Sequence, residues 1–189
     1  VRTIVEQVDA MKRLVNEFRD YARLPAADLK PLDLNVLIGD VLALYGAEGH
    51  DTHAIESELD LQCPPILGDA QQLRQVVHNL LQNAQDACET ALDKTGHVTI
   101  RTEWNALRQR VRMTVTDGGP GFDSNILQRA FEPYVTTKAK GTGLGLAVVK
   151  KIADEHQARI ELGNLQKDGR VIGAQVSLSF TVGKKRIGA

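Results

Sequence analysis

Three glycines alternate near the C-terminal third of the chain, at Gly141, Gly143 and Gly145 in TTKAKGTGLGLAVVKK, and an apolar segment follows. Glycine lets a backbone approach phosphate closely, and the first turn of a following helix offers unpaired N–H groups. The polar stretch YVTTKAK before them does not suit the buried strand of a dinucleotide-binding fold, and no Gly-Lys-Ser or Gly-Lys-Thr is present to make a P-loop. The pattern therefore predicts a phosphate-binding loop of another kind.

A second glycine-rich segment, DGGPGF, begins at Asp117 directly after the alternating stretch VRMTVTD. A carboxylate at the end of a strand can accept a hydrogen bond from an exocyclic amine, and Gly119 and Gly121 leave room for a flat ring. The alternative is an ordinary turn with a solvent-facing Asp, because Asp and Gly dominate turns.

Asn79 and Asn83 lie four residues apart in HNLLQNAQDA and so share one face of a helix. Asn is a poor residue for a helix interior, and its amide oxygen suits a hard cation such as Mg²⁺. The alternative is a pair of exposed polar residues on a solvated face. We interpret the neighbouring His78 as structural.

The elements that position these residues can be read from apolar spacing. Residues 1–25 carry a heptad seam that ends at Pro25, and a polar linker follows at 26–32. The seam indicates a helix that packs against partner helices in a bundle, with packing on its own domain as the alternative. The seam consists of Val1, Ile4, Val8, Met11, Val15, Phe18 and Ala22.

The remaining pattern alternates helices with strands. Helices are expected from Asp33 or Asn35, over much of 64–92, before Phe131 and over 144–156. Asp69 can cap the longest helix, with Gln72 in the capping-box position. Strands are expected at 50–60, 97–104 and 111–117, with a hairpin around Asp168-Gly169. The class is α+β, with helices layered on one face of a mostly antiparallel sheet.

Composition narrows the function. The 189 residues are 42% hydrophobic and 25% charged with a net charge of −1, which argues against nucleic acid as the main ligand. No apolar run approaches the roughly 20 residues that span a bilayer. Cys63 and Cys88 lack metal-site spacing and indicate buried thiols in a reducing cytosol. Because the chain opens at Val1 in mid-pattern, we expect a piece of a longer protein.

Four segments in order, HNLLQNAQDA, DGGPGF, FEPYVTTK and GTGLGL, resemble the Asn box, first glycine box, Phe box and second glycine box of sensor histidine kinases. That family has the Bergerat ATP-binding fold, a two-layer α/β sandwich shared with gyrase, Hsp90 and MutL. The segment from Phe131 to Ile152 is most similar to nitrogen-regulation sensor kinases of the NtrY and NtrB type. MKRLVNEFRDYARLP resembles the second helix of their dimerisation hairpin.

The resemblance implies ATP and Mg²⁺ as ligands. Asp117 would receive the adenine amino group, Asn83 would bind Mg²⁺, and Asn79 would lie beside the phosphates. Lys138 would reach the terminal phosphate, which with Asn79 gives the catalytic pair. The remaining nucleotide-binding residues would be Gly119 and Gly121 around adenine, Phe131 at the lid base, and Thr137, Gly141, Thr142, Gly143, Leu144 and Gly145 in the lid and the start of its helix.

The resemblance also implies a division of the chain and its partners. Residues 1–25 would be part of a dimerisation hairpin, 26–32 a linker, 33–183 the catalytic ATP-binding domain and 184–189 a tail. The hairpin would form a homodimer, and the phosphoryl group would pass to a response regulator. This region would be cytoplasmic, with the full-length protein attached to the inner membrane.

The sequence departs from the sensor histidine kinase pattern in two places, the phosphoacceptor motif and position 86. None of its histidines stands in the phosphoacceptor motif, so we expect this polypeptide not to complete autophosphorylation; they are His50, His53, His78, His97 and His156. Asp86 stands where many sensor kinases carry Lys. Asn79 stands where gyrase, Hsp90 and MutL have the Glu that activates water, and an amide cannot act as a general base. Two alternatives are a gyrase-like or MutL-like ATP switch and a nucleotide-free interaction module.

Overall fold

The protein, represented by a computed structural model, is described over residues 2–47, 55–90, 96–136 and 141–182. The tail expected at 184–189 lies outside these ranges. In chain order the elements are α1 (Arg2–Ala22), β1 (Lys30–Leu32), α2 (Leu34–Ala47), β2 (Ile55–Glu58), β3 (Ile66–Gly68), α3 (Ala70–Thr90), β4 (Val98–Asn105), β5 (Arg110–Asp117), α4 (Ser124–Arg129), α5 (Gly145–Glu155), β6 (Arg159–Lys167) and β7 (Arg170–Thr181).

The main sheet has five strands in the order β2-β4-β5-β7-β6. β2 runs parallel to β4, and the other neighbours in this sheet are antiparallel, so the expected mixed, mostly antiparallel sheet is confirmed. Asp117 ends the central strand β5, opposite Val98 of β4 and Ala174 of β7. Asp168 and Gly169 both have positive φ in the two-residue turn of the β6–β7 hairpin, as their residue types predict.

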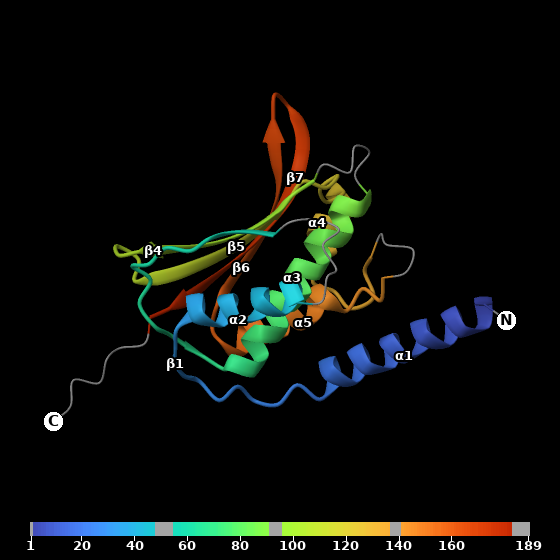
Figure 1. Ribbon diagram of the computed structural model, residues 1–189, viewed down its shortest axis with the longest axis horizontal. Coiled ribbons are helices and arrows are strands. Elements are labelled where there is room, and N and C mark those ends of the chain that lie inside the picture. Colours follow the sequence, from blue (N-terminus) through green and yellow to red (C-terminus); the bar gives the residue numbers. More distant parts are fainter. Residues whose placement is uncertain (1, 48–54, 91–95, 137–140, 183–189) are drawn as a thin grey trace.

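Helices α2, α3 and α5 cover one face of this sheet, and the β6–β7 hairpin extends beyond it (Figure 1). The face toward the helices is apolar because inward residues alternate along each strand, as with Val111, Met113 and Val115 of β5. α3 buries a stripe at helical spacing against them, which includes Val76, Leu80 and Ala84. The expected two-layer α+β arrangement is confirmed.

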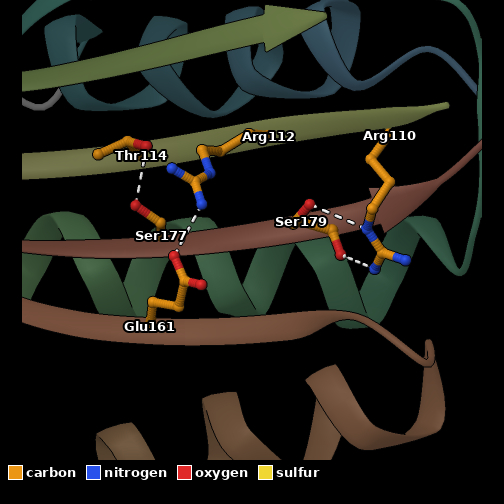
Figure 2. Close-up of polar contacts among 6 residues, drawn as sticks. All are labelled: Arg110, Arg112, Thr114, Glu161, Ser177 and Ser179. Carbon is orange, nitrogen blue, oxygen red and sulfur yellow. Dashed lines mark hydrogen bonds and ion pairs between the residues drawn. The ribbon is translucent and has the colours of Figure 1, made fainter. Parts of the chain in front are cut away.

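The opposite face of the sheet carries polar side chains of β5, β6 and β7 that pair with one another (Figure 2). The hydroxyl oxygens of Thr114 and Ser177 lie 3.0 Å apart across β5 and β7. Arg112 reaches over β7 to Glu161 of β6 at 2.7 Å, and Arg110 donates to Ser179. These side chains pair with one another across neighbouring strands, and none of the described helices covers this face (Figure 1). Both features are typical of the solvated side of an antiparallel sheet.

Carboxylate caps begin α2 and α3. Asp33 Oδ1 accepts hydrogen bonds from the N–H groups of Asn35 and Val36, so Asp33 is the cap of α2. Asp69 Oδ1 accepts those of Gln71 and Gln72, which confirms the predicted cap of α3.

The predicted capping box at α3 is wrong in its second half. A capping box needs the Gln72 side chain to accept from the Asp69 N–H. That N–H instead donates to His156 Nε2 at 2.9 Å, from the end of α5. Gln72 turns its amide nitrogen to the carbonyl oxygen of Pro25, at 2.8 Å. The Asp69 N–H and the Gln72 side chain therefore bind His156 and Pro25, which are distant in sequence, instead of each other.

α1 is a helix over Arg2–Ala22 and lies to one side of the sheet and its helices (Figure 1). The described side chains of its heptad seam are exposed, with Ile4 at 69% and Met11 at 68%. Its end contacts the rest of the chain through Lys151 of α5, whose Nζ donates to the carbonyl oxygen of Tyr21 at 2.8 Å. Beyond it, β1 pairs with β3, so the last three residues of the expected linker form a strand.

Candidate functional site

Asn79 and Asn83 lie on the face of α3 that meets the start of α5. The amide nitrogen of Asn79 donates to the carbonyl oxygen of Gly145 at 3.4 Å. A Cβ added at Gly145 would lie 3.5 Å from the amide nitrogen of Asn83. Both Asn side chains are half-buried. The Asn pair of α3 and the glycine segment 141–145, which the sequence indicated separately, thus meet in one place.

The glycine segment before α5 is folded back on residues 134–135. Tyr134 N–H donates to the carbonyl oxygen of Gly143 at 3.0 Å. Gly143 has φ +70°, and a Cβ there would lie 2.6 Å from the Tyr134 carbonyl carbon, so both conformation and space require glycine. Leu144 follows, fully buried, and fixes the start of α5 in the core.

α5 begins in this region, with Leu144 as its cap residue and Gly145 as its first residue. Thr142 Oγ1 accepts from the Leu144 N–H at 3.3 Å, whereas the cap residue Leu144 supplies no side-chain acceptor. The first N–H groups of a helix have no partner within the helix and attract anions. The arrangement suits a phosphate group beside the α5 N-terminus, where the two Asn residues of α3 also lie.

Asp117, at the end of β5, lies near the C-terminal end of α3, and backbone N–H groups hold its carboxylate. Its Oδ1 accepts from the Gly119 N–H at 2.9 Å and from the Ala174 N–H at 3.3 Å. A Cβ at Gly119 would lie 2.8 Å from the Cβ of Ala87, so the loop is packed directly against α3. Asn79 and Ala87 are eight positions apart, which is about 12 Å along the helix axis. Along one side of α3, therefore, Asn79 and Asn83 lie beside the α5 N-terminus, and Ala87 lies beside the loop that begins at Asp117.

The remaining predicted residues are distributed as follows. Gly121 has φ +78° in the loop after Asp117. Phe131 is half-buried just after α4, and Gly141 and Thr142 precede α5. Thr137 and Lys138 lie outside the described residues, so their expected place in the lid stays a prediction.

The two amides fit a hard cation in their chemistry. Asn79 uses its nitrogen toward Gly145, which leaves its oxygen as the atom to offer a metal or a hydrated metal. Asp86, one turn after Asn83, accepts from the side chain of Gln82 at 2.9 Å. Amide and carboxylate oxygens of this kind match Mg²⁺, which keeps several waters and takes few protein ligands.

The two cysteines are both free thiols. Cys88 is buried on α3 beside Gly96, and Cys63 is half-buried. Burial raises the pKa of each thiol above its ordinary value, so both are neutral at pH 7. The prediction of unpaired thiols is confirmed for both, and that of full burial for Cys88.

One residue near the site escaped the sequence reading. Asn164 of β6 pairs with the backbone of Phe122, 42 residues away. In the sequence, Asn164 is a single polar residue within an expected strand. Because side chains alternate along a strand, its spacing of two from the apolar Leu162 was the only sign that it faces the helices. Nothing local indicated its partner.

Comparison with known proteins identifies the class. Residues 68–183 match the family described as "Histidine kinase-, DNA gyrase B-, and HSP90-like ATPase", and the chain belongs to that family. The nitrogen regulation protein NtrY of Azorhizobium caulinodans is 36% identical over 94% of this chain. The resemblance to sensor histidine kinases of the NtrY type is thereby confirmed.

Solved structures agree in fold. Histidine kinase ShkA, full-length and in complex with AMPPNP, matches 94% of this chain with a TM-score of 0.75 and 29% identity. Histidine kinase ThkA, in complex with the response regulator protein TrrA, matches 98% with a TM-score of 0.75 and 22% identity, a likeness of fold. The chain covers 23% of NtrY, 37% of ShkA and 52% of ThkA. In the part of the chain that the structure describes, no helix has the length and apolarity to cross a membrane.

Proposed function

We propose that this chain is the catalytic ATP-binding region of a two-component sensor histidine kinase. It binds Mg-ATP and presents the γ-phosphoryl group to a His on a dimerisation hairpin. The observation that carries the proposal is the shared face of α3, with Asn79 and Asn83 against the α5 N-terminus and Asp117 held at the far end. The AMPPNP complex of ShkA supports the same ligand class.

Each part of the site has a physical role in this proposal. Asp117 accepts from the adenine amino group, and its fixed Oδ1 sets the orientation of the carboxylate. The α5 N-terminus and the loop from Gly141 to Gly145 hold the phosphates. Asn83, with Asn79 beside it, holds Mg²⁺, and Lys138 adds a point charge at the terminal phosphate. Bound Mg²⁺ supplies charge neutralisation for phosphoryl transfer, a reaction that depends mainly on positioning and electrostatics.

The rest of the proposal concerns the longer protein. Residues 1–25 are the second helix of the hairpin, 26–32 the linker and 33–183 the ATP-binding domain. The exposed apolar seam of α1 packs in a homodimeric bundle. The phosphoryl group passes to a response regulator, as the ThkA complex with TrrA suggests for this class. This region works in the cytoplasm, and the acceptor His comes from outside this chain.

Calorimetric titration of ATP, with and without Mg²⁺, tests the proposal. We expect Asp117→Asn to weaken ATP binding at least about tenfold, because hydrogen bonds to charged groups contribute about 1.5–3 kcal/mol. The matched control is Asp40→Asn, which removes an exposed carboxylate of α2 paired with Arg74. Such pairs contribute little, so its affinity should equal that of the unmodified chain.

The alternatives give different results in the same experiment. Unchanged affinity in Asp117→Asn would refute the assignment of that residue. Absence of binding at millimolar ATP would favour a nucleotide-free interaction module. Steady ATP hydrolysis without an acceptor would favour a gyrase-like or MutL-like switch, which the amide of Asn79 disfavours because it cannot activate water.

A further inference from the structure

The loop that follows Asp117 is hydrogen-bonded to a side chain of the β6–β7 hairpin, that of Asn164. Asn164 Oδ1 accepts from the Phe122 N–H at 2.7 Å, and Asn164 Nδ2 donates to the Phe122 carbonyl oxygen at 2.8 Å. One side-chain amide thus binds both polar atoms of one residue's backbone. Both bonds are partly buried, and the Phe122 side chain packs on the hydrophobic core.

The same hairpin contacts the loop at two further points. A Cβ at Gly121 would lie 2.5 Å from Val171 Cγ1 and 2.9 Å from Asn164 Oδ1. Ala174, which pairs with Asn164 across the hairpin, donates its N–H to Asp117 Oδ1. The hairpin therefore holds Asp117 at the start of the loop and Phe122 at its end.

The ladder of the hairpin does not depend on the Asn164 side chain. β6 and β7 pair through their main chains from Arg159–Ser179 to Lys167–Arg170, with one bulge after Leu165. Removing the amide leaves these bonds in place and releases only the loop. A released loop must be ordered again when a ligand binds, and that ordering reduces affinity.

We propose that Asn164 is a positioning residue for the base of the nucleotide, acting through Phe122 to keep the loop from Gly118 to Gly121 preformed. The inference rests on the proposed nucleotide site and assigns to β6 a part in it. The proposal predicts that the loss of Asn164 weakens binding of the nucleobase and leaves binding of the phosphates unchanged. ATP and ADP should therefore be affected equally.

The test compares Asn164→Ala and Asn164→Asp with the unmodified chain by calorimetry, using ATP and ADP with Mg²⁺. We expect Asn164→Ala to weaken both nucleotides about tenfold, the equivalent of one to two net hydrogen bonds. Asn164→Asp keeps the acceptor but turns an oxygen toward the Phe122 carbonyl, so its loss should be at least as large. Asn105→Ala, which removes another Asn-to-backbone bond at the far end of β4, should leave both affinities unchanged.

Hydrogen exchange on the unmodified chain provides a readout that does not depend on any variant folding. The Phe122 amide should be protected before nucleotide is added, and fast exchange there without ligand would overturn the inference. Affinities within twofold of the unmodified chain, with only the melting temperature lowered, would reduce Asn164 to a stabiliser of the fold. A change in the ratio of ATP to ADP affinity would place its effect at the phosphates and equally overturn it. Failure of the unmodified chain to bind either nucleotide would remove the proposed site itself.

Discussion

The two ends of α3 are attached to their surroundings in different ways. At its C-terminal end, α3 and the loop after Asp117 approach so closely that only glycine fits. We call this region the base end; it comprises Ala87, Cys88, Gly96 and Gly119, together with Gly173 of β7, which packs against Asp117 and Gly118. A Cβ at Gly119 would lie 2.9 Å from the carbonyl oxygen of Ala87, and one at Gly96 would lie 3.3 Å from Cys88 Cα as well as 2.8 Å from its Sγ. This end can be rearranged only by moving main chain.

At its N-terminal end, which we call the hinge end (Asp69, Gln72 and the segment 21–28), side chains hold a backbone. Asp69 Oδ2 accepts from the Asp28 N–H at 3.0 Å, and Gln72 Nε2 donates to the Pro25 carbonyl at 2.8 Å. A cleft of about 590 Å³ opens beside these contacts, between α1 and α3. Single hydrogen bonds to exposed backbone can be exchanged for water at low cost. The comparison indicates a rigid base end and a hinge end whose contacts are replaceable.

The largest effect that would test this contrast is expected at Gly173. A Cβ there would lie 1.9 Å from the carbonyl oxygen of Asp117, so the neighbouring pair of Asp117 and Ala174, the last of the β5–β7 ladder, could not keep its position. We expect Gly173→Ala to lower the free energy of unfolding by about 3 kcal/mol, measured by urea denaturation. It should also weaken nucleotide binding, because the adjacent Ala174 N–H donates to Asp117.

The matched control is Gly39→Ala. Gly39 is exposed on α2, and a Cβ there would meet no atom of the described residues within 4 Å. Alanine in a helix interior is favoured over glycine by about 0.5–1 kcal/mol, so this variant should be slightly more stable. Equal stability losses at the two glycines would contradict the close approach seen at the base end.

The next effect concerns Asp69 at the hinge end. Asp69→Ala removes the cap of α3 and the acceptor for the Asp28 N–H, and should cost about 1–2 kcal/mol of unfolding free energy. Asp69→Asn keeps an acceptor oxygen at the cap and should lose less. Thermal and urea unfolding of both variants measure the difference, and a loss in Asp69→Ala as large as that at Gly173 would contradict the contrast.

The same residue predicts a pH dependence. Burial alone would raise the pKa of Asp69, but hydrogen bonds from the N–H groups of Asp28, Gln72 and Gln71, with the nearby His156, outweigh it and lower the pKa. A lowered folded pKa stabilises the fold above the unfolded value of about 3.9, and this contribution is lost as pH falls through the folded pKa. Stability below about pH 4 should therefore fall less steeply in Asp69→Asn than in the unmodified chain. Parallel slopes would show that the carboxylate is not selectively stabilised in the fold.

The contrast also explains what the sequence could predict. Apolar periodicity over 21 residues was enough to place α3, and alternation placed β4 and β5. The three-residue strands β1 and β3 carry too few residues for any period, and a linker and a helix start were expected there instead. Gln72 and Asn164 bind partners 47 and 42 residues away, so local pattern could not supply either contact. Glycines were readable as a motif, but the neighbours that demand them came only from the fold.

The smallest effect is expected from Gln72→Met. Gln72 is 4% exposed, its Nε2 donates to Pro25, and its buried Oε1 has no hydrogen-bond partner among the residues that the structure describes. Met fills a similar volume without either polar group, so the substitution removes one hydrogen bond together with one unsatisfied acceptor. Pro25 is an exposed residue, so we expect its carbonyl oxygen to accept from water instead. These terms oppose each other, and the free energy of unfolding should change by less than about 1 kcal/mol in urea denaturation. A loss above about 2 kcal/mol would mean that the hinge end is held as firmly as the base end.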